Sequence, residues 1–220
     1  MTGVPVLYES DDILVVDKPE GLVSNARDLE SGLLPRVQGE RPGRLFIVHR
    51  LDKEVSGVLI LAKTAAAHRL LNDAFSRGEV RKTYLALVRG AVAGDKGVID
   101  RPLREFGSGR MGVDAARGKP SRTEWEVVER LGETALLRAR PLTGRRHQIR
   151  VHFYSIGHPV AGDLKYGDRA AQRAFPRLML HALDITLPPL GGAGEVKVAS
   201  PPPASFRAVL DEMGSRHLDS

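Results

Sequence analysis

The stretch Val48-His49-Arg50-Leu51-Asp52-Lys53-Glu54-Val55-Ser56-Gly57 runs directly into the apolar segment Val58-Leu59-Ile60-Leu61-Ala62. The apolar segment is short and continuous, which predicts a buried strand. The preceding stretch carries acidic and basic side chains and itself follows the apolar residues Phe46 and Ile47. Its charges must therefore lie at the rim of a core, where an unpaired charge is costly. This loop is the first candidate for a functional site.

The loop also has a purely structural interpretation, in which Asp52 caps a short turn and Arg50 pairs with it. Its order His-Arg-Leu-Asp-x-x-x-Ser-Gly nevertheless resembles motif II of the RluA-like pseudouridine synthases, in which the Asp is the catalytic carboxylate. A motif of this length needs support from the remainder of the chain.

Three further segments resemble the same family and follow in the expected order. Lys18-Pro19-Glu20-Gly21 resembles motif I, although Pro and Gly at these positions also form an ordinary turn. The strand-like segment 82–88 resembles the one whose Tyr stacks on the target base; for Tyr84 a plain core position is the structural alternative. Segments 144–152 and 157–163 resemble motif III, and this match is the longest and the most specific.

The resemblance extends from about residue 13 to residue 187 and implies an α+β fold. The implied architecture is a mixed, mainly antiparallel central sheet with flanking helices and an RNA-binding cleft. It is expected as a single catalytic domain over residues 1–220, without the S4-type domain of some relatives. The implied activity is an isomerase reaction that converts uridine in ribosomal or transfer RNA to pseudouridine. The N-glycosidic bond breaks, uracil rotates, and a C–C bond forms in place of the N-glycosidic bond.

By position in the family motifs, the catalytic residues are Asp52, Arg150 and Tyr84. Desolvation by a flipped base raises the pKa of a carboxyl group, whereas a cation within about 4–6 Å lowers it by roughly 1–3 units. Arg150 is expected to keep Asp52 ionised in this way, and Tyr84 to stack on the extruded base. The candidate substrate-binding residues are His49, Arg50, Lys82, Arg145, His147 and Gln148. For His49 a structural role is an equal alternative.

Two positions depart from the family pattern. Val55 stands where the family usually has Thr, which removes a hydroxyl group beside the catalytic loop. Ser24-Asn25 replaces the more usual Val-His-Pro-like ending of the preceding loop, which leaves the role of that loop in substrate binding open.

Composition limits the possible chemistry. The chain has 220 residues, 42% of them hydrophobic, no Cys and a net charge of +6. The absence of Cys excludes disulfides, thiolate nucleophiles and Cys-ligated metal centres. The positive charge moderately favours a polyanionic partner such as RNA. No long apolar run or export signal is present, so we expect a cytoplasmic monomer without cofactor, metal, membrane or obligatory protein partner.

Other functions fit the sequence less well. His147 and His152 are five residues apart, about 140° around a helix, so they cannot chelate a metal as an i, i+4 pair does. A serine hydrolase centred on Ser56 lacks the Gly-x-Ser-x-Gly elbow, because Glu54 occupies the first glycine position. The alternative that stays open is a non-catalytic RNA-binding or ribosome-assembly protein on the same fold.

Local patterns predict the elements that carry these motifs. Thr64 can cap a helix that extends to Ser76, and a second helix is predicted from Arg145 to Ile156, before Gly157. The Gly- and Arg-rich region 90–119 predicts a solvated loop, and contact of its basic residues, which include Arg110, with RNA phosphates is an added hypothesis. Strands are predicted over residues 4–8, 13–17, 80–88, 123–130, 134–140 and 178–187, the fourth and fifth as a hairpin.

Overall fold

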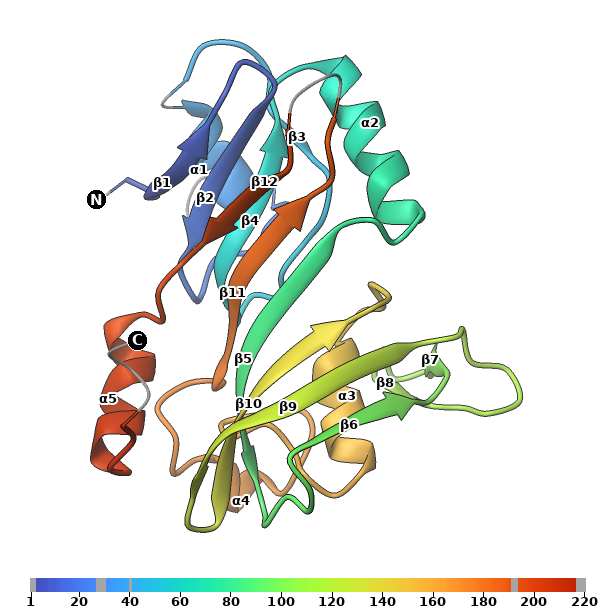
Figure 1. The fold of residues 1–220 in the computed structure, drawn as a ribbon, viewed down its shortest axis with the longest axis vertical. Helices are drawn as coiled ribbons and strands as arrows, with labels where there is room; N and C mark the ends of the chain where they lie inside the picture. Colours follow the sequence, from blue (N-terminus) through green and yellow to red (C-terminus); the bar gives the residue numbers. More distant parts are fainter. Residues whose placement is uncertain (1–2, 27–30, 40, 191–193, 217–220) are drawn as a thin grey trace. The chain divides into compact units, whose positions relative to one another are not determined.

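The computed structural model of the chain describes residues 3–26, 31–39, 41–190 and 194–216. The chain forms two compact units, which are described separately (Figure 1). Unit 1 consists of residues 1–82 and 182–201, and unit 2 of residues 83–181 and 202–220. Strands β5 (Arg81–Arg89) and β11 (Leu180–Leu187) contribute residues to both units.

Unit 1 contains a sheet in which β1, β2, β4 and β11 follow one another, and in which β1 pairs with β2 and β2 with β4 in antiparallel fashion. Strand β3 pairs with β4, and β12 pairs with β11. Lys18 at the end of β2 lies opposite Gly57 at the start of β4, so motif I begins beside the end of motif II. The elements special to this unit are β1 (Val6–Glu9), β2 (Ile13–Lys18), α1 (Leu33–Gly39), β3 (Phe46–Ile47), β4 (Ser56–Ala62), α2 (Ala65–Ser76) and β12 (Val196–Ala199).

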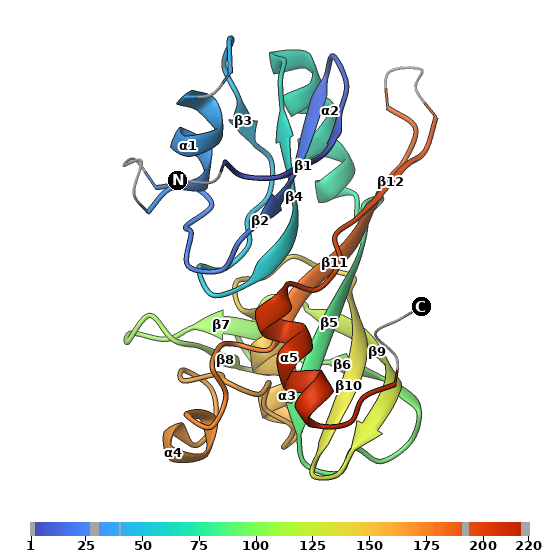
Figure 2. The same ribbon diagram turned by 90° about the vertical axis from the view of Figure 1, so that its left-hand side faces the viewer.

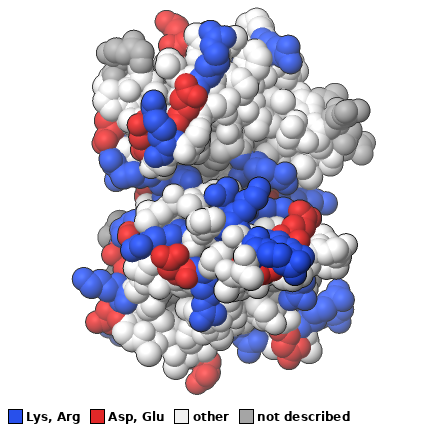
Figure 3. Space-filling view, turned by 90° about the vertical axis from the view of Figure 1, so that its right-hand side faces the viewer, with Lys and Arg blue, Asp and Glu red and all other residues white. Residues whose placement is uncertain are grey.

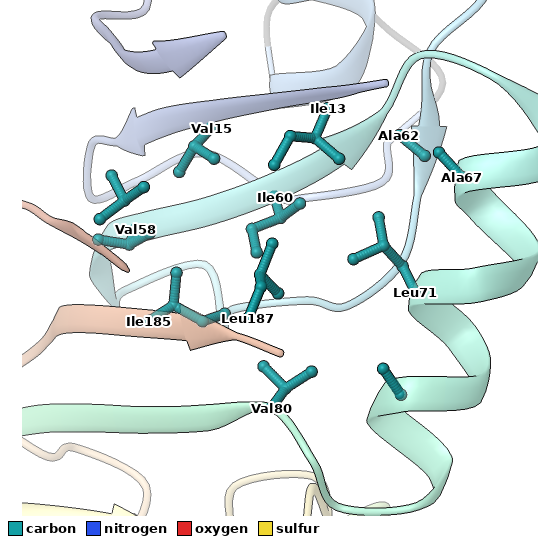
Figure 4. Close-up of a cluster of buried hydrophobic side chains, with 12 residues drawn as sticks. Ile13, Val15, Val58, Ile60, Ala62, Ala67, Leu71, Val80, Ile185 and Leu187 are labelled. Carbon is teal, nitrogen blue, oxygen red and sulfur yellow. The ribbon is translucent and has the colours of Figure 1, made fainter. Parts of the chain in front are cut away.

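Helix α2 packs on one face of this sheet. The Thr64 hydroxyl accepts a hydrogen bond from the Ala67 N–H and caps the helix, as predicted. Figure 4 shows Leu71 of α2 pointing towards Ile60 of β4, within a cluster of buried aliphatic side chains. Alternate residues of β2 and β4 supply this cluster because successive side chains of a strand point to opposite faces. This core fixes β4, which follows the candidate loop, and Phe46 of β3, which precedes the loop, packs against it.

Unit 2 is built on the antiparallel strand order β5-β10-β9-β6, with a separate β7-β8 hairpin (Figure 2). The predicted hairpin is confirmed as β9 and β10. The prediction of a loop over residues 90–119 is wrong, because this region contains three short strands. The local sequence does not indicate which strands they pair with. The elements are β6 (Lys96–Asp100), β7 (Leu103–Glu105), β8 (Met111–Val113), β9 (Arg122–Leu131), β10 (Thr134–Pro141), α3 (Gln148–Ser155), α4 (Arg169–Gln172) and α5 (Ala204–Glu212).

Helix α3 begins three residues later than predicted. His147 has φ +53°, a left-handed conformation that ends the incoming loop and cannot be part of the helix. All residues from Gln148 to Phe153 are buried, so the helix is contacted on more than one side, as its apolar pattern predicts.

The α+β fold with a mainly antiparallel sheet is confirmed. The organisation as a single catalytic domain stays a prediction. Among the described residues, no helix combines the length and apolar character that crossing a bilayer requires.

Candidate active site

The predicted catalytic loop joins β3 to β4 and is anchored by two buried apolar side chains, Leu51 and Val55. Between them the chain turns, and the Val55 N–H donates to the Asp52 carbonyl at 3.1 Å. Asp52 is half-buried, whereas Lys53 and Glu54 are exposed. Val55, which replaces the usual Thr of the family motif, therefore packs into the core. The turn is held by this main-chain hydrogen bond, without a side-chain hydroxyl at position 55.

The segment that follows β2 holds this loop on both sides of Asp52. On one side the Ser24 hydroxyl donates to the Leu51 carbonyl at 2.9 Å and accepts from the Leu51 N–H at 3.1 Å. On the other side the Lys53 carbonyl accepts from the Gly21 N–H at 2.8 Å and from Lys18 Nζ at 3.3 Å. The main chain at Asp52 is thus fixed between two sets of hydrogen bonds. Sequence reasoning left the role of Ser24 open.

Lys18 is fully buried, which is rare for a lysine. Besides the Lys53 carbonyl, its Nζ donates to the carbonyls of Pro19 at 2.9 Å and Leu22 at 2.8 Å. A buried ammonium group is tolerated when its protons are bonded in this way. The predicted motif I is therefore more than a turn, because it connects β2 to the candidate loop.

Gly57 is required where the loop enters β4. Its φ is +114°, and a Cβ at this position would lie 2.2 Å from the carbonyl oxygen of Ala182 in β11. A side chain would strain the backbone and also clash with backbone atoms. The glycine of the predicted motif thus permits the close approach of a neighbouring strand.

His49 extends the β3–β4 pairing through its side chain. Its Nε2 accepts from the Ile60 N–H at 3.0 Å, and its ring stacks on Phe75 with centroids 5.0 Å apart. Burial, and secondly the charge of Lys82, lower the pKa of His49 from 6.5 to about 3. The ring is therefore neutral near pH 7 and carries its proton on Nδ1. These contacts support the structural alternative for His49.

The two basic candidates of unit 1 differ in their surroundings. Lys82 Nζ lies 5.8 Å from the centroid of the Phe75 ring, and burial lowers the pKa of Lys82. Arg50 is exposed and forms no hydrogen bond or ion pair with the described residues. Arg50 is therefore the better placed of the two for a phosphate group of a substrate.

In unit 2, Arg150 of α3 forms a buried ion pair that the sequence analysis did not anticipate. Arg150 Nε donates to Asp163 Oδ2 at 2.7 Å and Nη2 donates to Oδ1 at 2.8 Å. The side chains are 4% and 0% exposed. Asp163 Oδ1 also accepts from the N–H groups of Lys165 and Tyr166. Such a two-point contact fixes the plane of the guanidinium group. The motif III resemblance included Asp163 without giving it a role.

Tyr166 lies beside this pair. The Arg150 guanidinium is 5.3 Å from the centroid of its ring. The Tyr166 hydroxyl accepts from the Met111 N–H at 3.1 Å and lies 2.7 Å from His147 Nδ1. Burial raises the pKa of Tyr166. His147 is therefore tied to the same cluster as Arg150.

Gln148 uses all four of its side-chain hydrogen-bond positions within the protein. Its Oε1 accepts from Thr143 Oγ1 at 2.6 Å and from the Arg145 N–H at 3.1 Å. Its Nε2 donates to the Arg122 carbonyl and to Thr123 Oγ1. Gln148 is buried. Its contacts give it a structural role at the start of α3, and its contact with substrate stays a prediction.

The remaining candidates of unit 2 are Tyr84 and Arg145. Tyr84 is half-buried on β5, opposite Ala139 of β10. Arg145 is exposed, and its Nε donates to the Pro120 carbonyl at 3.3 Å. Asp52 belongs to unit 1 and Arg150 to unit 2, so their predicted pairing stays a prediction.

Positive charge is prominent on the surface. On the face shown in Figure 3, Lys and Arg side chains are more widespread than Asp and Glu side chains. Together with the net charge of +6, this distribution suits contact with a phosphate backbone.

Comparison with known proteins identifies the family. The sequence profile described as RNA pseudouridylate synthase matches residues 12–155. The dual-specificity RNA pseudouridine synthase RluA of Escherichia coli K12 is 41% identical over 209 residues, which cover 91% of this chain and 93% of the relative. The ribosomal large subunit pseudouridine synthase C of Haemophilus ducreyi is 37% identical over 219 residues, which cover 94% of this chain and 68% of the relative.

A solved structure agrees with the sequence comparisons. The human RNA pseudouridylate synthase domain containing 1 protein matches with a TM-score of 0.79 and 30% identity, over 97% of this chain and 95% of that one. The profile match spans most of the chain and includes both the loop around Asp52 and Arg150 of α3. This chain therefore belongs to the RNA pseudouridylate synthase family.

Proposed function

We propose that this protein isomerises uridine to pseudouridine in RNA, with Asp52 as the catalytic carboxylate. The observation that carries the proposal is the loop around Asp52, which hydrogen bonds hold at both Leu51 and Lys53, in a chain of this family. A group that must meet a reacting atom needs such a rigid support. The support acts on the main chain of the loop, and the half-buried carboxylate is directed to the substrate.

The proposed reaction conserves all atoms. The bond from N1 of uracil to C1′ of the ribose breaks, the base rotates, and a bond from C5 to C1′ forms. N1 gains a proton and C5 loses one. Asp52 acts either by attack on the sugar or base or by proton abstraction, and both routes require its ionised form. In the proposed arrangement Arg150 faces Asp52, and the ion pair with Asp163 holds Arg150 in place.

Target recognition is assigned to separate groups. Tyr84 stacks on the extruded uracil, which contributes about 1–3 kcal/mol for a base on an aromatic ring. Arg50 and Arg145 contact phosphates that flank the target, because both are exposed. Ribosomal RNA and transfer RNA are the proposed substrate classes. A monomer in the cytoplasm without an obligatory protein partner is proposed as well.

Replacement of the candidate carboxylate tests the proposal. We expect Asp52→Asn to keep its RNA affinity and to make no pseudouridine, because the amide neither attacks nor abstracts a proton. The measurement is carbodiimide primer extension on RNA from a strain that lacks the gene, after incubation with purified protein. The uridines that lose modification when the gene is deleted identify the substrate.

Glu54→Gln is the matched control, because Glu54 is an exposed carboxylate of the same loop. This variant should modify RNA like the wild type. Activity of Asp52→Asn would show that another residue is the catalytic group. A wild-type protein that binds RNA and modifies no uridine would support the alternative, a non-catalytic RNA-binding protein on this fold.

A further inference from the structure

Unit 2 has an open pocket of about 400 Å³ between the β7-β8 hairpin and α3. This volume lies within the range of roughly 300–1,000 Å³ that is usual for small-ligand sites. The hairpin contributes Phe106 and Arg110, the helix contributes Val151 and Tyr154, and Tyr166 closes one side. Among these residues, only Val151 lies within the segment that resembles motif III. Arg110 belongs to the Arg-rich region 90–119, for which contact with RNA phosphates is a sequence-based hypothesis, and the other lining residues named here were not candidates.

The pocket is preformed because its floor is a small core of its own. Leu103 and Met111 of the hairpin pack with Val151 and Tyr166 in one buried apolar cluster. The Tyr166 hydroxyl accepts from the Met111 N–H, which fixes the hairpin against the side of the pocket. At the tip, the Phe106 N–H donates to the Arg110 carbonyl at 2.9 Å, so the two lining residues are held together.

The upper walls of the pocket are exposed aromatic rings. Phe106 is 40% exposed and Tyr154 is 45% exposed. The Phe106 ring lies directly over Gly112, where a Cβ would be only 2.8 Å from the ring carbon Cε2. Exposed rings with fixed positions are suitable platforms for stacking, since they lose little freedom when a ligand binds.

Arg110 supplies a positive charge at the same place. Its guanidinium lies 5.8 Å from the centroid of the Tyr154 ring and 5.1 Å from that of the Tyr166 ring. The neighbouring Arg104 and Arg146 form ion pairs with Asp114 and Glu105. Arg110 forms no ion pair with any carboxylate in the described part of the chain. An aromatic wall with an unneutralised cation matches a nucleotide, which offers a planar base and a phosphate.

The pocket is also close to Arg150. The guanidinium groups of Arg110 and Arg150 both lie over the Tyr166 ring, at 5.1 and 5.3 Å from its centroid. The two cations are therefore at most about 10 Å apart, or about three steps of a stacked strand with a rise of 3.4 Å. A strand whose target uridine is near Arg150 can place a neighbouring nucleotide here.

The geometry points to a second nucleotide site in unit 2, in which an unstacked base of the RNA strand near the target lies against Tyr154 and Phe106 and its phosphate contacts Arg110. This inference rests on the proposed function. The second site would make the enzyme more selective among RNAs. Only an RNA that can expose a base at this distance from the target uridine fills both sites.

The test separates binding from chemistry. Tyr154→Leu keeps an apolar side chain and removes the aromatic platform, and Tyr154→Phe keeps the platform. We expect Tyr154→Leu to raise KM for the modified RNA about 10-fold with kcat within about twofold, and Tyr154→Phe to match the wild type. Arg110→Gln should raise KM and reduce its salt dependence. Tyr8→Leu, at an exposed tyrosine of unit 1, is the control and should change neither constant.

A cross-linking experiment locates the base without any turnover. The probe is a single-stranded RNA octamer in which 5-iodouridine replaces uridine, irradiated with the wild-type protein and analysed by mass spectrometry. A cross-link to Tyr154 or Phe106 is the expected result. Absence of both cross-links, or an unchanged KM of Tyr154→Leu, would overturn the second site even if pseudouridine is formed. Loss of all modification by the wild type would instead overturn the proposed function, while the cross-link would still report on the pocket.

Discussion

In unit 1 the loop around Asp52 is held through its main chain, whereas in unit 2 the guanidinium of Arg150 is held through its side chain. Lys18, Gly21 and Ser24 bond to the main chain of the loop. Arg150 is paired with a fully buried carboxylate, Asp163. The first arrangement fixes a backbone. The second fixes the direction of a charge and makes that charge depend on its partner.

The largest expected effect is in unit 2. Asp163→Asn leaves Arg150 buried beside a neutral amide, and removal of one partner of a buried ion pair costs about 3–5 kcal/mol. We expect a loss of this size in the free energy of unfolding, measured by urea denaturation at pH 7.

Glu195→Gln is the control for Asp163→Asn. Glu195 also pairs with an arginine, Arg81, at 2.7 Å, but these side chains are 51% and 68% exposed. An exposed pair contributes about 0–1 kcal/mol. Similar losses in the two variants would contradict the distinction between a buried counter-ion and a surface pair.

A smaller effect is expected for the main-chain support in unit 1. Ser24→Ala removes both hydrogen bonds to Leu51 and leaves a buried N–H without this acceptor. The expected cost is about 1–3 kcal/mol in the free energy of unfolding. Because the loop next to Asp52 loosens, kcat should fall while KM is nearly unchanged. Ser76→Ala, at an exposed serine of α2, is the control for hydroxyl removal. A Ser24→Ala variant with normal kcat would show that the loop does not need this support.

The smallest effect concerns pH. The pKa of His49 is lowered to about 3 in the folded state, so the unfolded chain takes up a proton below about pH 6.5 and the folded chain does not. His49 therefore lowers stability as pH falls from about 6.5 towards 3, by at most about 1.4 kcal/mol per pH unit, and has no effect above this range. His49→Gln keeps an acceptor for the Ile60 N–H and should weaken this dependence.

The matched variant in unit 2 is His152→Gln. Burial also lowers the pKa of His152, but its hydrogen bond to the Arg101 carbonyl acts in the opposite direction. His152→Gln should therefore weaken the pH dependence less than His49→Gln does. Urea denaturation at pH 7 and pH 5 measures both, and an unchanged pH dependence in His49→Gln would show that this ring is protonated in the folded state.

Local signals in the sequence predicted much of the fold. The cap at Thr64, the helix to Ser76 and the hairpin around Gly132 follow from side chains that act on their immediate neighbours. The strands in 90–119 were missed because short, Gly- and Arg-rich strands are stabilised by distant partners, such as β9 for β6. The left-handed conformation of His147 was missed because no local pattern requires it in a residue other than glycine.

The site was predicted only in part. The resemblance to the family indicated Asp52 and Arg150, and residue types alone did not. The Asp163 partner lies 13 residues from Arg150 and required the three-dimensional structure, as did the pocket formed by a hairpin, a helix and Tyr166. For His49 and Gln148 the sequence could not distinguish a substrate contact from an internal hydrogen bond, because both uses favour the same polar side chain.

The acceptors for Lys18 have a consequence for sequence drift. Three acceptors of its Nζ are peptide oxygens, those of Pro19, Leu22 and Lys53. An amino acid exchange at an accessible position such as Lys53 keeps the oxygen in place and alters only what the surface presents to RNA. The anchoring of the loop by these three bonds and its selectivity for RNA can thus evolve separately, because the bonds depend on the lysine and on the course of the backbone.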